Sequence, residues 1–231
     1  MPLPQRIDAV FFDVGGPFYP DVSYVDAVLT ALDLMRAERG LGPTDRERFQ
    51  EIYDDQRQRQ CGSLRSQLAT EFLDSGARAE LHERTRHFWV HPSEALYADV
   101  LPLLRQLHGV VRIGVLANQE RTAVDAMIRD GVAPFIDVWG ISAIVGYEKP
   151  SPDIFNWALG QAGTDAVHAV HVGNRLDNDV RAAHAVGLGT VWLLRGEAPD
   201  DPTPEQRAQA DLVVSDLTGL GEILLGGSTA R

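Results

Sequence analysis

Residues 6–19 read RIDAVFFDVGGPFY, and this stretch decides the fold. The run 9–12 is wholly apolar, which is typical of a short strand buried on both faces. Asp13 follows at once, and the Gly-Gly-Pro sequence at 15–17 predicts a turn. Ligands of open α/β sheets bind at the carboxyl ends of the strands, so Asp13 is a candidate functional residue. Its alternative role is to cap the loop.

The composition indicates a globular protein that binds neither nucleic acid nor a membrane. The chain has 231 residues, 44% of them hydrophobic, which suits one large domain or a core with a smaller insert. A formal net charge of −12 disfavours nucleic acid and anionic lipid as partners. The single cysteine excludes an internal disulfide, and neither a secretion signal nor a membrane span of ~20 apolar residues is evident. We expect a soluble cytoplasmic protein, with its oligomeric state open.

The spacing of apolar residues changes within the chain. Between 21 and 92 they recur at helical spacing in four successive segments, without the alternation typical of strands. From residue 93 strands alternate with helices, which predicts a parallel sheet with right-handed crossovers. The predicted fold is α/β: a Rossmann-like three-layer core of residues 1–20 and 93–231, with an all-helical cap domain at 21–92.

Three histidines need an interpretation. His87 and His91 are four residues apart, a spacing that can place two imidazoles on one helix face. Neither a carboxylate nor a thiolate joins them at ligand spacing, and Pro92 follows directly, so a metal site is disfavoured. His171 lies in a predicted strand, and we expect it to be packed in the sheet rather than to act as a base.

Polar residues follow three of the predicted strands. Because the carboxyl ends of parallel strands meet at one edge of a sheet, we expect them to converge. Lys149 lies just before a predicted helix and can fold back over that edge, within ion-pair distance of the first carboxylate. It is the only lysine among 21 basic residues, which indicates a position that needs a compact ammonium group. The strand-end residues are Asp13, then Ala117 and Asn118, then Gly173 and Asn174, with Asp177 and Asp179 close behind.

In this order the segments FFDVGG, VLAN, GYEKPSPDIF and HVGNRLDNDVRAAHAVGL resemble the four motifs of the haloacid dehalogenase superfamily. Most members of that family transfer phosphoryl groups through an aspartyl nucleophile, and the helical insert resembles their C1-type cap. The resemblance implies that Asp13 is the nucleophile and Lys149 its catalytic partner. It implies substrate binding by Gly16, Ala117, Asn118 and Lys149, and Mg²⁺ binding by Asp13, Gly15 (through its carbonyl), Asn174 and Asp179.

Three positions depart from the phosphatase pattern of that family. Gly15 stands where the second aspartate acts as general acid and base, and Ala117 replaces a serine or threonine hydroxyl. Asn174 replaces an aspartate that binds magnesium. An uncharged amide oxygen holds magnesium less strongly, and a missing proton donor costs about 10²- to 10⁴-fold in rate. We therefore expect a weakened metal site and a preference for stable leaving groups.

Three functions stay open on these residues. The first is a magnesium-dependent phosphatase that acts on a small anionic organic phosphate. The second is a metal-independent haloacid dehalogenase, because that subfamily also lacks the second aspartate and has the spacing of Asn174 and Asp177. Gly15, where those enzymes carry an aromatic residue, and the phosphatase-like Asp179 argue against it. The third is a non-catalytic binding protein, which retention of the aspartate and the lone lysine disfavours.

Overall fold

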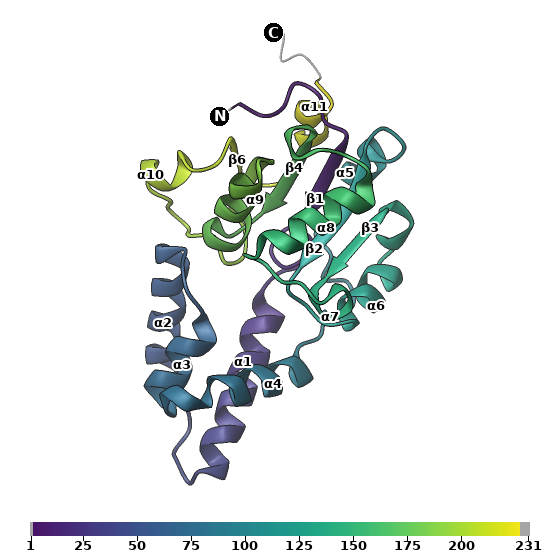
Figure 1. The fold of residues 1–231 in the computed structure, drawn as a ribbon. Coiled ribbons are helices and arrows are strands. Elements are labelled where there is room, and N and C mark those ends of the chain that lie inside the picture. The colour runs from purple at the N-terminus through teal and green to yellow at the C-terminus, as the bar shows by residue number, and fades with distance from the viewer. Residues whose placement is uncertain (1, 227–231) are drawn as a thin grey trace. The chain divides into compact units, whose positions relative to one another are not determined.

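The structure, a computed structural model, describes residues 2–226 (Figure 1). They form two compact units. Residues up to Pro20 and from Ser93 onward form the first unit, and Asp21–Pro92 forms the second. Within the described residues we find no helix whose length and apolar character would let it cross a membrane.

A six-stranded sheet in the order β3-β2-β1-β4-β5-β6 forms the centre of the first unit (Figure 1). All five pairings are parallel, so the carboxyl ends of the strands lie at one edge. The predicted α/β fold with a parallel sheet is confirmed. The strands are β1 (Ala9–Phe12), β2 (Arg112–Ala117), β3 (Val138–Ile141), β4 (Ala169–Gly173), β5 (Gly189–Leu193) and β6 (Leu212–Val214).

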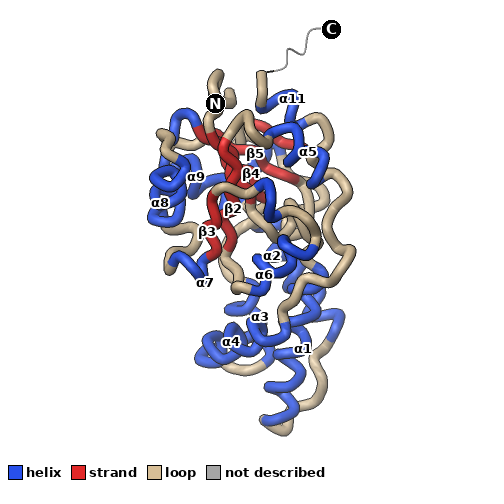
Figure 2. The backbone as a smooth tube through the Cα atoms, turned by 90° about the vertical axis from the view of Figure 1, so that its right-hand side faces the viewer, coloured by secondary structure: helices blue, strands red, loops and turns tan. Residues whose placement is uncertain are grey.

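Helices cover both faces of this sheet. Figure 2 shows α8 and α9 on one side of the strands and α5 and α11 on the other. Side chains of the strands pack with α5, α6 and α11 in one hydrophobic cluster and with α8 and α9 in a second, which gives three layers. The helices are α5 (Val100–Leu107), α6 (Thr122–Arg129), α7 (Ser142–Val145), α8 (Pro152–Ala162), α9 (Arg181–Val186), α10 (Pro204–Arg207) and α11 (Leu220–Leu224).

Strand β1 explains why the stretch 9–12 is apolar without interruption. Successive side chains of a strand point to opposite faces. Val10 and Phe12 belong to the first cluster and Ala9 and Phe11 to the second, and all four are fully buried. The strand is therefore at the centre of both hydrophobic layers, and it ends at Asp13.

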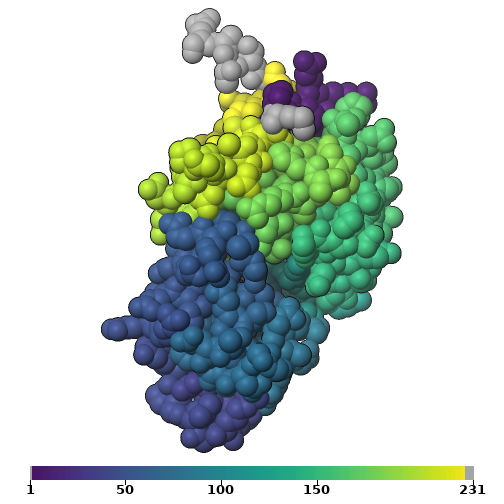
Figure 3. Space-filling model, turned by 60° about the vertical axis from the view of Figure 1, so that its left-hand side comes forward, coloured from purple at the N-terminus to yellow at the C-terminus, as the bar shows by residue number. Residues whose placement is uncertain are grey.

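The second unit, whose atoms are blue in Figure 3, is helical. Its described residues contain no strand, as predicted. Its core contains apolar side chains from all four helices. Asp45 and Ser63 cap α2 and α3 through their side chains, because each accepts hydrogen bonds from backbone N–H groups of the first turn. The helices are α1 (Val22–Glu38), α2 (Arg46–Arg59), α3 (Leu64–Phe72) and α4 (Arg78–Phe88).

Several local features of the structure were not evident from the sequence. His87 and His91 do not share a helix face, because α4 ends at Phe88. A proline disfavours the helical conformation of the residue before it, so Pro92 explains why His91 lies outside the helix. The short helices α7 and α10, and a π-helical turn at Leu176–Val180, were not predicted because each is shorter than two turns and has no clear period.

Candidate active site

Three charged side chains that are far apart in sequence meet at the carboxyl edge of the sheet. Lys149 Nζ lies 3.0 Å from Asp13 Oδ1 and 2.6 Å from Asp179 Oδ1. The side chains of Lys149 and Asp179 are 2% and 1% exposed, whereas that of Asp13 is 16% exposed. The prediction that Asp13 and the lone lysine lie within ion-pair distance is confirmed. Asp13 is the member of this trio that solvent and a ligand reach.

Asp13 is held by its backbone and by one carboxylate oxygen. Its N–H donates to Val172 O at 2.9 Å, which continues the pairing of β1 with β4. Oδ1 accepts from Val14 N at 2.8 Å and pairs with Lys149. Among the described residues Oδ2 makes no hydrogen bond or ion pair. One oxygen is thus fixed in orientation while the other keeps its lone pairs for a reaction or a cation.

Asn118 fixes the loop that carries Lys149. Its Nδ2 donates to Lys149 O at 2.7 Å, and its Oδ1 accepts from Lys149 N at 2.7 Å. Both polar atoms of the Asn118 side chain are therefore engaged within the protein. The sequence places this residue among those that bind substrate, but the structure gives its side chain the task of positioning the lysine. Ala117, directly before it, ends β2 fully buried.

Both carboxylate oxygens of Asp179, which the sequence predicts to bind a metal, are engaged by other groups of the protein. Oδ1 accepts from Lys149 Nζ and from His171 Nε2 at 3.0 Å, and Oδ2 accepts from Arg175 N at 2.9 Å. A Cβ on Gly173 would lie 2.2 Å from Asp179 Cγ, so only glycine allows this close approach. These contacts argue against Asp179 as a direct metal ligand and make it the anchor of Lys149.

The electrostatics of the trio follow from burial and from one shared cation. Burial raises the pKa of Asp13 to about 6; the Lys149 ammonium opposes this rise and the Asp179 charge adds to it. Burial also acts to raise the pKa of Asp179, but Lys149 and the His171 hydrogen bond hold it well below its usual range. Burial works against the charge of Lys149, yet the two carboxylates raise its pKa. With all three groups ionised, one negative charge is in excess, which favours a further cation nearby.

Asn174 and Gly16 are in close contact at this edge. The Asn174 side chain is buried, and its Nδ2 donates to Arg195 O at 3.1 Å. Gly16 has φ 81°, and a Cβ there would lie 2.1 Å from Asn174 Nδ2. Position 16 therefore needs glycine both for its backbone conformation and for the space that Asn174 occupies.

Gly16→Ala is expected to destabilise the protein more than Gly163→Ala does. Gly163 also has a positive φ, 67°, but nothing lies within 4 Å of the Cβ position. The control should cost about 1–2 kcal/mol in the free energy of unfolding through backbone strain alone. The overlap with Asn174 should add about 1–3 kcal/mol at Gly16. Urea unfolding measures both losses in stability. Equal losses would show that the Asn174 side chain moves aside for the added Cβ without cost.

The oxygen ligands at this edge fit Mg²⁺, but they are few. Asp13 offers Oδ2, Asn174 an amide oxygen and Gly15 a backbone carbonyl, all hard ligands of the kind that magnesium prefers. No group of three or more His, Cys, Asp or Glu residues is arranged to hold a metal in the described part of the chain. Magnesium is commonly held by one or two carboxylates together with substrate phosphates and waters. The residues present therefore suit a weak magnesium site that a phosphorylated ligand completes.

Two arginines that support this edge were missed at the sequence level. The Arg195 guanidinium pairs with Asp99, with Nη1 at 3.1 Å from Oδ1, and lies 4.3 Å from the centre of the Tyr97 ring. The Arg175 guanidinium donates to both oxygens of Asp177 at 2.9 and 2.8 Å. Arg195 could have been found, because it follows a predicted strand as the other site residues do. Its ion pair could not, because Asp99 lies far from it in sequence.

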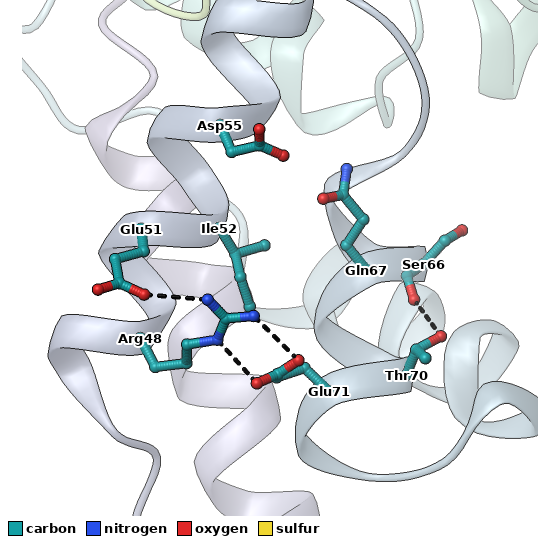
Figure 4. Close-up of a pocket in the computed structure, with 8 residues that line it drawn as sticks. All are labelled: Arg48, Glu51, Ile52, Asp55, Ser66, Gln67, Thr70 and Glu71. Atoms are coloured by element: carbon teal, nitrogen blue, oxygen red, sulfur yellow. Dashed lines mark hydrogen bonds and ion pairs between the residues drawn. The ribbon is translucent and has the colours of Figure 1, made fainter.

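A separate pocket in the helical unit has a different character (Figure 4). It has a volume of about 720 Å³ and lies between α2 and α3. Figure 4 shows Arg48 between Glu51 and Glu71, with which it pairs at 3.0 and 2.7 Å. Asp55 pairs with Arg59 at 3.1 Å. The three carboxylates of Glu51, Asp55 and Glu71 outnumber the two arginines around this pocket, which disfavours an anionic ligand, so the strand ends remain the candidate active site.

Comparisons with known proteins identify the family of this chain. A family model described as haloacid dehalogenase-like hydrolase matches residues 7–187. Glyceraldehyde 3-phosphate phosphatase of Methanopyrus kandleri is 30% identical over 211 residues, which cover 84% of this chain and 87% of that protein. Ribulose-1,5-bisphosphate 5-phosphatase of Halopiger xanaduensis is 28% identical over 247 residues, which cover 94% and 98%.

Solved structures show the same fold. The magnesium-bound HAD-hydrolase YfnB of Bacillus subtilis matches with a TM-score of 0.66 and 21% identity, over 95% of this chain and 99% of that one. The family model covers well over half of the present chain, and Asp13 and Lys149 both lie within the matched residues. The chain therefore belongs to the haloacid dehalogenase-like hydrolases.

Proposed function

We propose that this hydrolase is a magnesium-dependent phosphatase that removes a phosphoryl group from a small phosphorylated sugar or a related organic phosphate. The observation that carries the proposal is the partly exposed Asp13 carboxylate, paired with the only lysine of the chain at the ligand-binding edge of the sheet. Two relatives that match most of this chain have names that specify phosphatases of phosphorylated sugars, which supports the substrate class.

In the proposed reaction the Asp13 carboxylate attacks phosphorus and the bond from phosphorus to the ester oxygen breaks. The leaving alkoxide takes its proton from water, because position 15 carries no acid. A water molecule then attacks the aspartyl phosphate, which releases inorganic phosphate and restores the Asp13 carboxylate.

Several residues of this chain support these steps. Lys149 stays cationic, orients Oδ1 and offsets negative charge on the phosphoryl oxygens. The backbone near Gly16, Ala117 and Asn118 lies at the same edge and is proposed to contact the phosphate. Magnesium held by Asp13, the Gly15 carbonyl and Asn174 would neutralise charge on the phosphoryl group.

A substrate screen tests this proposal. Purified protein is assayed on sugar phosphates, an aryl phosphate and haloacids, each with magnesium and with EDTA. We expect hydrolysis of phosphate esters that EDTA abolishes and added magnesium restores, and no hydrolysis by Asp13→Asn. Turnover of haloacids without metal, with phosphates untouched, would overturn the proposal in favour of a dehalogenase. No turnover of any compound would indicate a binding protein.

The dehalogenase alternative rests on the spacing of Asn174 and Asp177. In the structure the Asp177 carboxylate is held by Arg175 through both oxygens, and Oδ1 also accepts from Asn178 N at 2.9 Å. These bonds leave it poorly suited to assist a reaction at Asp13. We therefore keep this alternative only as an outcome of the screen.

The location and the ligand class of the protein remain predictions. We propose the cytoplasm, because the single cysteine, Cys61, is free and exposed, which suits a reducing compartment. We propose a small anionic substrate as the partner, because magnesium at this edge, together with the Lys149 ammonium, would offset the charge of a phosphate ester.

A further inference from the structure

His171 has a position that the proposed reaction does not use. It lies in β4 with a fully buried side chain, and its Nε2 is 3.0 Å from Asp179 Oδ1. This is the same oxygen that Lys149 Nζ approaches to 2.6 Å. The rings of His171 and Phe155 pack nearly perpendicular to each other, with 5.3 Å between the ring centres. The buried imidazole of His171 is thus connected to the catalytic lysine through one shared oxygen of Asp179.

The geometry defines which ring nitrogen of His171 carries a proton. Asp179 is a carboxylate that already binds an ammonium group, so Nε2 must donate to it. Nδ1 makes no hydrogen bond of good geometry to a described residue, and the unprotonated nitrogen of a neutral ring tolerates this better than an N–H does. Burial lowers the pKa of His171, although Asp179 and the backbone of Phe11 oppose this, which agrees with a neutral ring.

We propose that His171 is a positioning residue for Lys149. As a neutral donor it shares Asp179 Oδ1 with the ammonium group and satisfies part of that carboxylate without adding charge. Lys149 consequently stays between Asp179 and Asp13. Without this donor, Asp179 draws the ammonium group away from Asp13. The catalytic consequence of this inference rests on the proposed function, but the position of Lys149 can be measured without turnover.

The lone lysine makes that measurement direct. Protein labelled with ¹³C and ¹⁵N only in lysine gives one set of side-chain NMR signals, because Lys149 is the only lysine. His171→Phe removes the donor and keeps an aromatic ring. His184→Phe is the matched control, because His184 makes a similar bond to Asp211, 2.8 Å long, that does not involve Lys149. His171→Gln restores an N–H near the position of Nε2.

We expect His171→Phe to shift the Lys149 signals and to lower kcat about 10- to 100-fold, with KM nearly unchanged, because a small misplacement of a catalytic group has effects of this size. His184→Phe should leave the Lys149 signals in place, and His171→Gln should restore both the signals and most of kcat. A folded His171→Phe protein with wild-type lysine signals and wild-type kcat would overturn the inference.

Two outcomes need separate readings. If the wild type turns over no phosphate ester, the proposed function fails while the lysine signals still decide whether His171 positions Lys149. If His171→Phe does not fold, His171→Asn is compared with His171→Gln, because the asparagine amide is too short to reach Asp179. Identical lysine signals in these two variants would likewise overturn the inference.

Discussion

Lys149→Met is expected to abolish turnover and to lower the free energy of unfolding by about 3–5 kcal/mol. Lys149 is the cation between two carboxylates, and its side chain is 2% exposed. Methionine fills a similar volume but leaves Asp13 and Asp179 close together without a counter-charge. Removing one partner of a buried ion pair is costly because the remaining charge keeps its desolvation penalty. The loss of activity has a separate cause, since the nucleophile and the phosphoryl group both lose their positive partner.

The stability loss of Lys149→Met should depend on pH with a defined sign. Burial raises the pKa of Asp13 to about 6 even with the ammonium group present, and its removal raises this pKa further. A carboxyl group whose pKa is higher in the folded than in the unfolded protein favours folding while it is protonated. That contribution is lost as the pH rises through the folded-state pKa. Urea unfolding should therefore show a small loss near pH 5 and the full loss near pH 8.

The double variant Lys149→Met/Asp179→Asn separates stability from catalysis. Replacing Asp179 by an amide removes one of the two unpaired charges, so most of the lost stability should return. Turnover should not return, because Asp13 still lacks its ammonium partner. If Lys149→Met alone were as stable as the wild type at pH 8, the two carboxylates would not be buried without a counter-charge. Turnover by Lys149→Met would contradict the role of Lys149.

The fold could be predicted from two sequence signals. The apolar run 9–12 identifies a strand buried on both faces, and its side chains indeed lie in both core clusters. The change of apolar spacing near residues 21 and 92 separates a helical segment from an alternation of strands and helices. Short elements such as α7 were not predicted, because four residues show too little periodicity and their conformation depends on tertiary contacts.

The site was predictable only in part, for a physical reason. Parallel strands bring their carboxyl ends together whatever the side chains are, so strand ends alone identify Asp13 as a site residue. What each side chain does depends on its partners in space. Asn118 binds the backbone of Lys149, 31 positions away, and His171 binds Asp179, which binds Lys149 in turn. No periodicity encodes such pairings, so the positioning roles of Asn118 and His171 emerge only from the fold.

Asn174→Asp is expected to strengthen magnesium binding and to make the protein depend on the ion for stability. In the wild type the Asn174 amide donates to Arg195 O at 3.1 Å. A carboxylate cannot donate, so this bond is lost at a cost of about 1 kcal/mol. It also adds a negative charge to a trio that already has one in excess. Magnesium relieves that repulsion and gains a hard anionic ligand.

Thermal unfolding across a magnesium series measures this effect without an assay. A ligand that binds only the folded state stabilises it by an amount that grows with the ratio of its concentration to Kd, about 2.7 kcal/mol at 100 Kd. Tm of Asn174→Asp should start below that of the wild type without magnesium and rise more steeply with it. Equal slopes for the two proteins would mean that position 174 does not contact the ion.

Adding Gly15→Asp to Asn174→Asp should raise activity on alkyl phosphates, sugar phosphates included, far more than on aryl phosphates. Gly15, unlike Gly16, is not among the described glycines with positive φ, so its backbone accepts an L side chain. An aryl oxide leaves without a proton, whereas an alkoxide needs one. A positioned acid accelerates that step by about 10²- to 10⁴-fold. We therefore expect a gain of this order on alkyl esters and a far smaller gain on aryl esters.

Initial rates against magnesium concentration for the wild type, Asn174→Asp and the double variant decide among the three functions, with Asp13→Asn as the blank. A phosphatase gains activity at lower magnesium with the first substitution, and the second raises its rate mainly on alkyl esters. A dehalogenase loses activity at the first substitution whatever the metal, because an added carboxylate repels its anionic substrate from Asp13. A binding protein gains affinity for magnesium and turns over nothing in any form. The substitution Asn174→Asp thus tests metal affinity and reaction class in one measurement. The added carboxylate favours a phosphate ester that binds together with magnesium, and it disfavours an anionic haloacid that binds without a metal.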